Sequence, residues 1–547
     1  MADTTLGAAG AARPGLFLRN ATGLVKAWST FDAFVYSFWS VNLITLGLYG
    51  MSYVYYVPDG QLLAAILLFG VLTTFLVITY AMMVSVMPRT GGDYAWQSRV
   101  LGGGLGFVLS ITGWWFTLFL WAPIYANILN VQFFLPLAYT LGWAGVATFF
   151  GTHTGVFVSC LIVLAFVSVV VTLGMESYAR IQKICFWIGL AGLAVVIVLL
   201  LFASQSDFQN AFNREATSLF GAKAGAYQAT IDAGTKAGYV PHDFGFFSLG
   251  PIFLVLPWLA FYLLWPNWGA TLYGEVRGAK DIRKPFWSMF WGLWVTIALV
   301  AVVMILVVKT MGWQFYNAAN AAFYAGTAPV GTWPYPVMFA GWLVNNHLFQ
   351  ALLIIVMGLW FFGWAGTLFL SSTRVIFAAA FDRVLPSWAA NISAKRRVPY
   401  GSLVLMIVPS VVVSAIYAYQ PSFTSVFLDA TAVLALTFLA TVIAAVILPW
   451  RRKDLYDASP IARYKIAGVP TITIVGVVTG LFLLFMLYQW SFNPDNLYGT
   501  SFQKTPNSVI YFVATYVVAV VIYVAARIYR SRQGIDLRRI HHEIPVE

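Results

Sequence analysis

An apolar stretch that contains three prolines is the part of this sequence best suited to hold a small solute. Residues 244–274 include no Asp, Glu, Lys or Arg, although they include Pro251, Pro257 and Pro266. A proline inside a helix removes a backbone donor and leaves the carbonyl four residues earlier without its usual partner. Within a membrane, such a carbonyl is tolerated where it lines a protein cavity or binds a ligand. The sequence therefore predicts a helix interrupted near residues 264–267 and a solute site at the interruption.

The first apolar segment offers a second place where a helix could unwind. Asn, Thr and Gly residues lie at its mid-depth, where lipid-facing positions are normally apolar. If the chain contains an inverted repeat, this segment should break as the later one does. The alternative is a polar helix face that packs against neighbouring helices. The predicted solute contacts on the two segments are Ser40, Val41, Asn42, Leu43, Thr45, Gly47, Phe261, Tyr262, Leu264, Trp265, Pro266 and Asn267.

Ionisable side chains are rare within the apolar segments, which argues against catalysis there. Asp32, Asp429 and Arg374 lie near the ends of their segments, and none reaches mid-membrane. A charged residue at mid-membrane would mark a functional site by default. A polyamine cargo, or proton coupling at the centre, would need a buried carboxylate there, and the sequence offers none. Scattered histidines and two cysteines inside apolar segments predict no metal site and no cofactor. A polytopic membrane enzyme is the alternative of a different class, disfavoured because no His, Asp or Glu cluster falls at either interface.

Composition places these segments in an all-α polytopic membrane protein. Of the 547 residues, 61% are hydrophobic and 9% are charged, whereas soluble domains are about 25% charged. A crossing helix needs about 20 apolar residues, and division of the charge-free windows at Gly, Pro and polar clusters predicts twelve transmembrane helices. Their expected ranges are 31–56, 62–86, 104–138, 153–173, 183–203, 248–272, 286–310, 346–380, 402–419, 425–449, 468–490 and 507–529.

The distribution of lysine and arginine orients the predicted spans. With the N-terminus inside, 26 of the 31 basic residues fall on the cytoplasmic side and five outside, as expected from the excess of basic residues in cytoplasmic loops. We therefore expect a multi-pass protein of the plasma (inner) membrane with cytoplasmic N- and C-termini. Because this topology and anionic membrane lipids account for the net charge of +12, no nucleic-acid partner is implied. No cleavable signal peptide is predicted, since the first 30 residues lack an apolar core.

The predicted spans divide the chain into six regions. Spans 1–5 and 6–10 begin and end with opposite orientations, as an inverted repeat of five helices requires. Short helices at the membrane surface are expected in the external segments after spans 5 and 7. The regions are a cytoplasmic lead (1–30), a first five-helix repeat (31–203), an extracellular loop (204–247), a second five-helix repeat (248–449), two additional helices (450–529) and a cytoplasmic tail (530–547).

Three motifs on the predicted cytoplasmic side resemble those of the amino acid–polyamine–organocation permeases. Residues 87–99 read MPRTGGDYAWQSR, similar to the family's P-R-[ST]-G-G-[DAS]-Y signature. Residues 274–285, which begin GEVR and end RKP, resemble its G-E-V-x-(N-P) element, and residues 372–386 resemble S-R-x-x-[FY]-A…R-D-x-x-L-P. The resemblance covers span 1 to about span 10. It implies a LeuT-like fold of five-plus-five inverted repeats with two extra helices, discontinuous helices 1 and 6, and alternating access.

The resemblance also implies where a solute and its gates would lie. Solute would be held between spans 1, 3, 6, 8 and 10, where aromatic residues concentrate. The gating residues expected at the inner surface are Arg89, Asp93 and Glu275. For Glu275, the alternative is a solvated ion pair with nearby basic residues, worth at most about 1 kcal/mol. The additional solute contacts implied on spans 3 and 8 are Trp121, Tyr125, Trp364 and Thr367.

The chain departs from the family pattern at the expected solute site. The glycines of the family's span-1 G-x-G are replaced by Leu43 and Thr45, and residues 265–267 replace a glycine, an aromatic residue and a glutamate. A span-5 lysine of some proton-coupled relatives falls at Gly189, so the coupling ion, sodium or proton, stays open. The expected function is symport or exchange of amino acids or related small neutral or zwitterionic solutes. A nucleobase-, amide- or amine-type solute on the same fold is the alternative.

Overall fold

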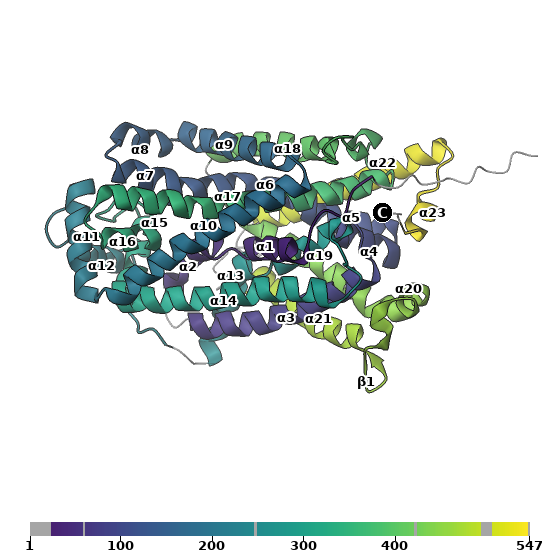
Figure 1. Ribbon diagram of the computed structural model, residues 1–547, viewed down its shortest axis with the longest axis horizontal. Coiled ribbons are helices and arrows are strands. Elements are labelled where there is room, and N and C mark those ends of the chain that lie inside the picture. The colour runs from purple at the N-terminus through teal and green to yellow at the C-terminus, as the bar shows by residue number, and fades with distance from the viewer. Residues whose placement is uncertain (1–22, 58–60, 246–248, 421–423, 494–505, 545–547) are drawn as a thin grey trace, which may run out of the picture.

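Most helices of the computed structural model run along the long axis of the molecule (Figure 1). The structure describes residues 23–57, 61–245, 249–420, 424–493 and 506–544, so most of the predicted lead and the end of the predicted extracellular loop lie outside it. Eleven stretches among these residues are long and apolar enough to cross a membrane. They are Thr30–Met51 (α1, η1 and α2), Leu62–Val86 (α3), Gly103–Thr140 (α5, η3, α6, η4 and α7), His153–Thr172 (α9), Met175–Phe202 (α10), Arg283–Met311 (α14), His347–Phe381 (α17), Tyr400–Tyr419 (α18), Thr431–Arg451 (in α19, Thr424–Arg451), Thr471–Phe492 (α21) and Val509–Arg532 (in α22, Pro506–Arg532).

The predicted sixth span is not among these eleven stretches, and its helix is interrupted. Helix α13 (Leu249–Leu263) ends three residues before Pro266, and the tighter 3₁₀-helix η5 (Pro266–Glu275) follows. Pro257 lies inside α13 without ending it. The interruption is therefore associated with Pro266, whose missing N–H cannot continue the helical ladder.

The first predicted span is also interrupted. Helix α1 (Thr30–Ser40) gives way at Asn42 to the π-helical turn η1 (Leu43–Gly47), which continues into α2 (Leu48–Met51). Asn42 begins this turn because its side-chain oxygen accepts a hydrogen bond from the Thr45 N–H at 2.9 Å. The two interrupted segments lie side by side, since α1 packs against η5 and α13 packs against η1.

Short elements close the two ends of the bundle (Figure 1). One end carries the segments that the sequence predicts to be cytoplasmic, and the opposite end carries those predicted to be external. The first group is α4 (Gly92–Val100), η6 (Ser387–Ala390), α20 (Lys453–Asp457), η8 (Pro460–Arg463), the antiparallel strands β1 (Lys465–Ile466) and β2 (Val469–Pro470), and α23 (Leu537–His542). The second is η2 (Val54–Tyr56), α8 (Ala144–Phe150), α11 (Gln205–Phe220), α12 (Ala226–Lys236), α15 (Trp313–Tyr324) and α16 (Pro336–Trp342).

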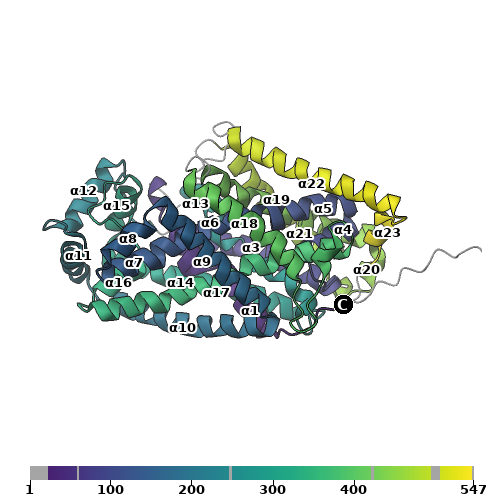
Figure 2. The ribbon, with the colours of Figure 1, turned by 90° about the horizontal axis from the view of Figure 1, so that it is seen from above.

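Burial identifies the centre of the bundle. In the apolar part of span 1, 89% of the residues are buried, whereas in the apolar part of α22 only 11% of the residues are buried. Figure 2 shows α22 along the outside of the molecule. The interrupted span 1 is thus enclosed by other helices, which allows the polar groups of its unwound turn to be satisfied by protein instead of lipid.

Candidate functional site

The interruption in span 6 is held by side chains that bond to its backbone. The Ser37 hydroxyl donates to the carbonyl of Pro266 at 2.9 Å, and the Trp265 indole N–H donates to the carbonyl of Phe261 at 2.7 Å. The Ser371 hydroxyl, on α17, donates to the carbonyl of Trp268 at 3.1 Å. Three carbonyls near the break therefore bond to side chains, where the sequence predicts main-chain groups turned toward a solute.

Polar side-chain atoms, in contrast, are left without hydrogen bonds around the same break. Among the described residues, these buried atoms include the hydroxyls of Tyr125 and Tyr262, both amide atoms of Asn267, and the indole N–H groups of Trp268 and Trp364. A buried donor or acceptor without a partner costs about 1–3 kcal/mol. A solute that entered here could meet these groups, all of which are uncharged.

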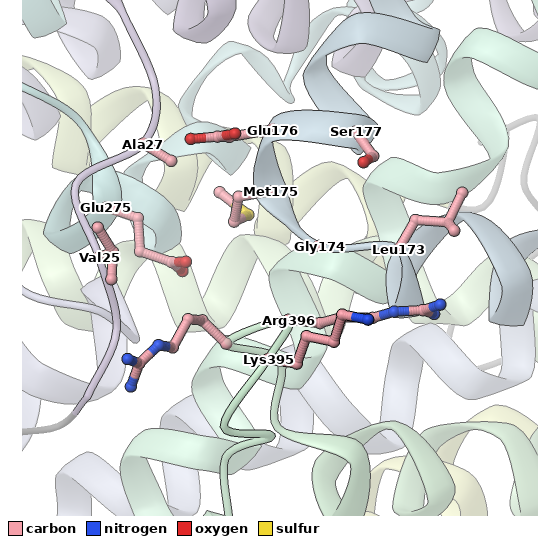
Figure 3. Close-up of a pocket in the computed structure, with 11 residues that line it drawn as sticks. Val25, Ala27, Leu173, Gly174, Met175, Glu176, Ser177, Glu275, Lys395 and Arg396 are labelled. Atoms are coloured by element: carbon pink, nitrogen blue, oxygen red, sulfur yellow. The ribbon is translucent and has the colours of Figure 1, made fainter.

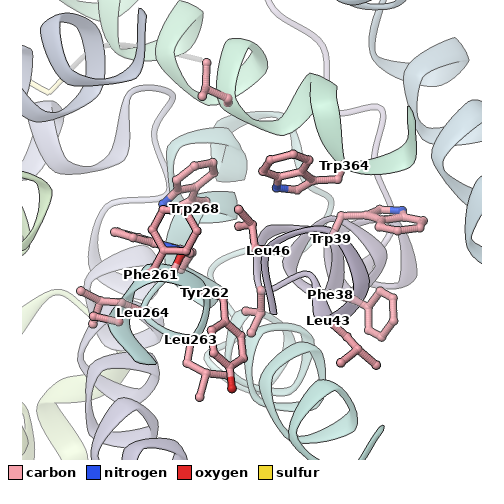
Figure 4. Packing of buried hydrophobic residues seen from close by; sticks show 14 of the residues in the cluster. Phe38, Trp39, Leu43, Leu46, Phe261, Tyr262, Leu263, Leu264, Trp268 and Trp364 are labelled. Carbon is pink, nitrogen blue, oxygen red and sulfur yellow. The ribbon is translucent and has the colours of Figure 1, made fainter. Parts of the chain in front are cut away.

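Aromatic rings from three spans pack around these groups. The rings of Tyr125, on α6, and Trp364, on α17, stack with centroids 3.5 Å apart. Trp121 lies 5.4 Å from Trp265 and 6.3 Å from Trp268, measured between ring centroids. Figure 4 shows Trp268 and Trp364 on either side of Leu46 of span 1. The environment is therefore apolar, with hydrogen-bonding groups only at defined positions, as is usual for small-molecule sites.

All sixteen predicted solute contacts are buried, but several are engaged in bonds that hold the fold. Asn42 accepts from the Trp360 indole at 2.6 Å and donates to the Thr45 hydroxyl at 3.1 Å. The hydroxyls of Ser40 and Thr367 donate to carbonyls within their own helices. These side chains are positioning groups in this structure. Val41, Leu43 and Leu264 are apolar and buried, and a β-carbon at Gly47 would lie 3.4 Å from the Tyr262 ring.

The prediction omits residues that the packing brings to the break. Trp268 lies one turn of η5 after Trp265 and contributes an unpartnered N–H. Tyr36 donates to the Thr367 carbonyl at 2.7 Å and so joins span 1 to α17. The three-residue spacing of Trp265 and Trp268 could have identified Trp268, because three residues make one turn of a 3₁₀-helix.

The three predicted gating residues do not form one cluster. Glu275 pairs with Arg374, with N–O distances of 2.8 and 3.2 Å, and both side chains are buried. The alternative of a solvated pair with nearby basic residues is therefore wrong for this structure. Arg89 is partly exposed and donates to the Pro88 carbonyl at 3.3 Å, whereas Asp93 is buried and bonds to other residues.

A cavity of about 350 Å³ opens beside Glu275 at the end of the bundle predicted to be cytoplasmic. Figure 3 shows Glu275 beside Val25 and Ala27 of the lead, with Lys395 and Arg396 on a separate wall. The lead is attached here through the backbone, since the Trp28 N–H donates to the Glu275 carbonyl at 3.1 Å. Glu275, the last residue of η5, thus lines this cavity and pairs with Arg374 of α17.

No three His, Cys, Asp or Glu side chains among the described residues are grouped so that they could hold a metal ion. A second buried ion pair joins Arg99 to Asp382 at the same end as Glu275. The site therefore consists of aromatic rings and neutral polar groups, with ion pairs on one side of it.

Comparison with known proteins agrees with this architecture. The chain is 24% identical over 438 residues to the branched-chain amino acid permease BcaP of Lactococcus lactis subsp. cremoris, covering 77% of this chain and 81% of that protein. It is 23% identical over 380 residues to an uncharacterized transporter of Rhizobium meliloti, covering 67% and 68% of the two chains. The sequence model for amino acid permeases matches residues 36–522. The chain is a multi-pass membrane transporter and belongs to the amino acid permease family.

Proposed function

We propose that this permease is a secondary active transporter of an amino acid, or of a related small zwitterionic solute, that works by alternating access. The observation that carries the proposal is the set of buried, unpartnered polar side-chain atoms at the interruption of span 6. Their cost is removed when a solute supplies the missing hydrogen bonds. Because binding relieves this cost, the site is matched to a polar guest of small size.

The chemistry of the groups favours a zwitterion with an apolar part. Hydroxyls of Tyr125 and Tyr262 and indole N–H groups of Trp268 and Trp364 can donate to a carboxylate, and the Asn267 carbonyl can accept from an ammonium group. No net charge is offered, so the two charges of the solute would balance each other. The aromatic walls suit an aliphatic side chain, in keeping with the relative named a branched-chain amino acid permease.

The architecture proposed for this activity has twelve crossings, with α13 and η5 together forming the sixth. Residues 31–203 and 248–449 would be the two inverted repeats, followed by two additional helices, with both termini on the cytoplasmic side of the plasma membrane. Two observations support this arrangement: the interrupted helices lie side by side, and the predicted cytoplasmic and external segments lie at opposite ends. The Glu275–Arg374 pair would then be part of the inner gate, and the adjacent cavity part of the inner vestibule.

Counterflow in proteoliposomes tests the proposed function without any assumption about a coupling ion. Vesicles loaded with one unlabelled solute are placed in a trace of the same solute in labelled form, with a panel of amino acids, nucleobases and amides. We expect counterflow of branched-chain or other apolar amino acids, and none in protein-free vesicles. Absence of counterflow for every amino acid would refute the proposal, and counterflow of nucleobases or amides alone would move the substrate to that class. Recovery of the label unchanged separates transport from an enzymatic reaction.

A further inference from the structure

Asp93 is a fully buried carboxylate whose partners are all neutral. Its oxygens accept hydrogen bonds from the Tyr80 hydroxyl on α3, the Thr441 hydroxyl on α19 and the Trp114 indole N–H on η3, the last at 3.0 Å. Three separate helices therefore converge on one carboxylate. These donors can stabilise the ionised form, although none of them carries a compensating charge.

The absence of a cationic partner distinguishes Asp93 from the other buried acidic residues of the described chain. Asp32 pairs with Lys183, Glu215 with Arg214, Glu275 with Arg374, and Asp382 with Arg99. No ion pair formed between described residues includes Asp93. Burial of an ionised carboxylate without a counter-ion is energetically unfavourable, and uptake of one proton removes that penalty.

Apart from Tyr80, the ionisable groups on the elements around Asp93 do not bond to it. Tyr80 is the one titratable group that contacts it. Arg374 on α17, Asp382 directly after α17 and Glu275 on η5 are held in the ion pairs described above. The Arg451 guanidinium on α19 donates to the Val100 carbonyl at 3.2 Å, and His541 on α23 lies 3.2 Å from the Tyr94 hydroxyl. Burial raises the pKa of the Asp93 carboxyl to about 6. A carboxyl with this pKa changes its protonation state between mildly acidic and neutral pH.

Asp93 is mechanically connected to the interrupted helix. The Trp114 ring, which donates to Asp93, lies 5.9 Å from the Trp268 ring of η5 in an edge-to-face arrangement. Gly92, the preceding residue, has a φ of +35°, and a β-carbon there would lie 3.0 Å from the backbone of Ala270. Because α4 approaches η5 this closely, movement of η5 would change the surroundings of Asp93.

We propose that Asp93 is a proton-binding site whose occupancy is coupled to movement of η5 and its solute. The inference rests on the proposed transport function and names its coupling ion. One proton binds to an Asp93 carboxylate oxygen while Asp93 is shielded from water. When the bundle opens and water reaches Asp93, the proton is released to that water. No bond other than O–H forms or breaks.

The test compares the wild-type protein with Asp93→Asn in the same proteoliposomes, with two assays. Wild type should accumulate solute when the outside is acidic, and the variant should reach only equilibrium while counterflow persists, because a neutral side chain can still cycle. Asp457→Asn, a change at an exposed carboxylate on α20, should behave as wild type. Three results would each overturn the proposal. The Asp93→Asn variant could accumulate solute as wild type does, or it could lose counterflow although correctly folded. Alternatively, accumulation by wild type could be independent of the proton gradient.

An infrared pH titration keeps the proton site testable even if no transported solute is found. We expect a protonated-carboxyl band that appears near pH 6 in wild type and is missing in Asp93→Asn. Thr441→Val removes one donor to the ionised form, so its titration midpoint should move to higher pH. A band that persists in Asp93→Asn, or a midpoint that does not move in Thr441→Val, would refute the proton site without bearing on solute transport. Absence of counterflow with an intact Asp93 band would instead refute the proposed solute while supporting the proton site.

Discussion

Replacement of Glu275 by glutamine should destabilise the protein by about 3–5 kcal/mol, the cost of leaving one member of a buried ion pair without its partner. The magnitude follows from the geometry. The Arg374 side chain is 0% exposed and loses two charge-assisted bonds, at 2.8 and 3.2 Å, when the carboxylate becomes an amide. Glutamine keeps the size of the side chain, so the change reports on charge more than on packing.

The assay is reversible denaturant unfolding of the purified protein in detergent micelles, followed by tryptophan fluorescence. Asp454→Asn is the matched control, because Asp454 pairs with Arg452 but is 61% exposed, and such a pair contributes at most about 1 kcal/mol. The double variant Glu275→Gln/Arg374→Met removes both charges and should recover part of the loss. If Glu275→Gln is as stable as wild type, the assignment of a buried ion pair is refuted. Glu275 would then form a solvated ion pair with nearby basic residues.

Three further predictions concern the break and its surroundings. Tyr125→Phe removes an unpartnered hydroxyl, so solute binding measured by isothermal titration should weaken by about 0.5–1.5 kcal/mol, while the unfolding midpoint stays unchanged or rises. Weaker binding accompanied by equal destabilisation of the fold would contradict a solute contact. Pro266→Ala restores a backbone donor to the interruption and should lower counterflow with the protein still folded, and a wild-type rate would show that the break is dispensable. Gly92→Ala places a β-carbon 3.0 Å from the Ala270 backbone and should reduce thermal stability, with Gly145→Ala, where that space is open, as the control.

Prediction from sequence succeeds here where the physical cause is local. Hydropathy over about 20 residues identifies eleven of the twelve expected spans as stretches long and apolar enough to cross a membrane, because transfer of each residue into an apolar phase contributes nearly independently of its neighbours in space. The interruption at Pro266 is equally local, since a missing N–H acts within one helical turn. Within the motif of residues 87–99, the positive φ values of Gly91 (+91°) and Gly92 (+35°) form a tight turn at the start of α4, a backbone shape that glycine adopts readily.

The partners of the polar side chains could not be predicted in the same way. Arg374 is 99 residues from Glu275 in the chain, whereas Arg277 and Lys280 are close in sequence and do not form the pair. Asn42 and Thr367 have the chemistry of solute contacts, yet packing places their polar groups against Trp360 and the Trp364 carbonyl. The rotation of each helix about its axis decides such contacts, and that rotation depends on the packing of all its neighbours.

Sequence alone thus determined the membrane class, eleven of the twelve expected spans and the position of the break, because apolar transfer and proline geometry act over short distances along the chain. Only the tertiary structure decided that the freed carbonyls bond to Ser37, Trp265 and Ser371, that neutral donors surround Asp93, and that Glu275 is buried against Arg374. These features depend on which faces of distant helices meet, and burial from water is what makes their hydrogen bonds and charges matter energetically.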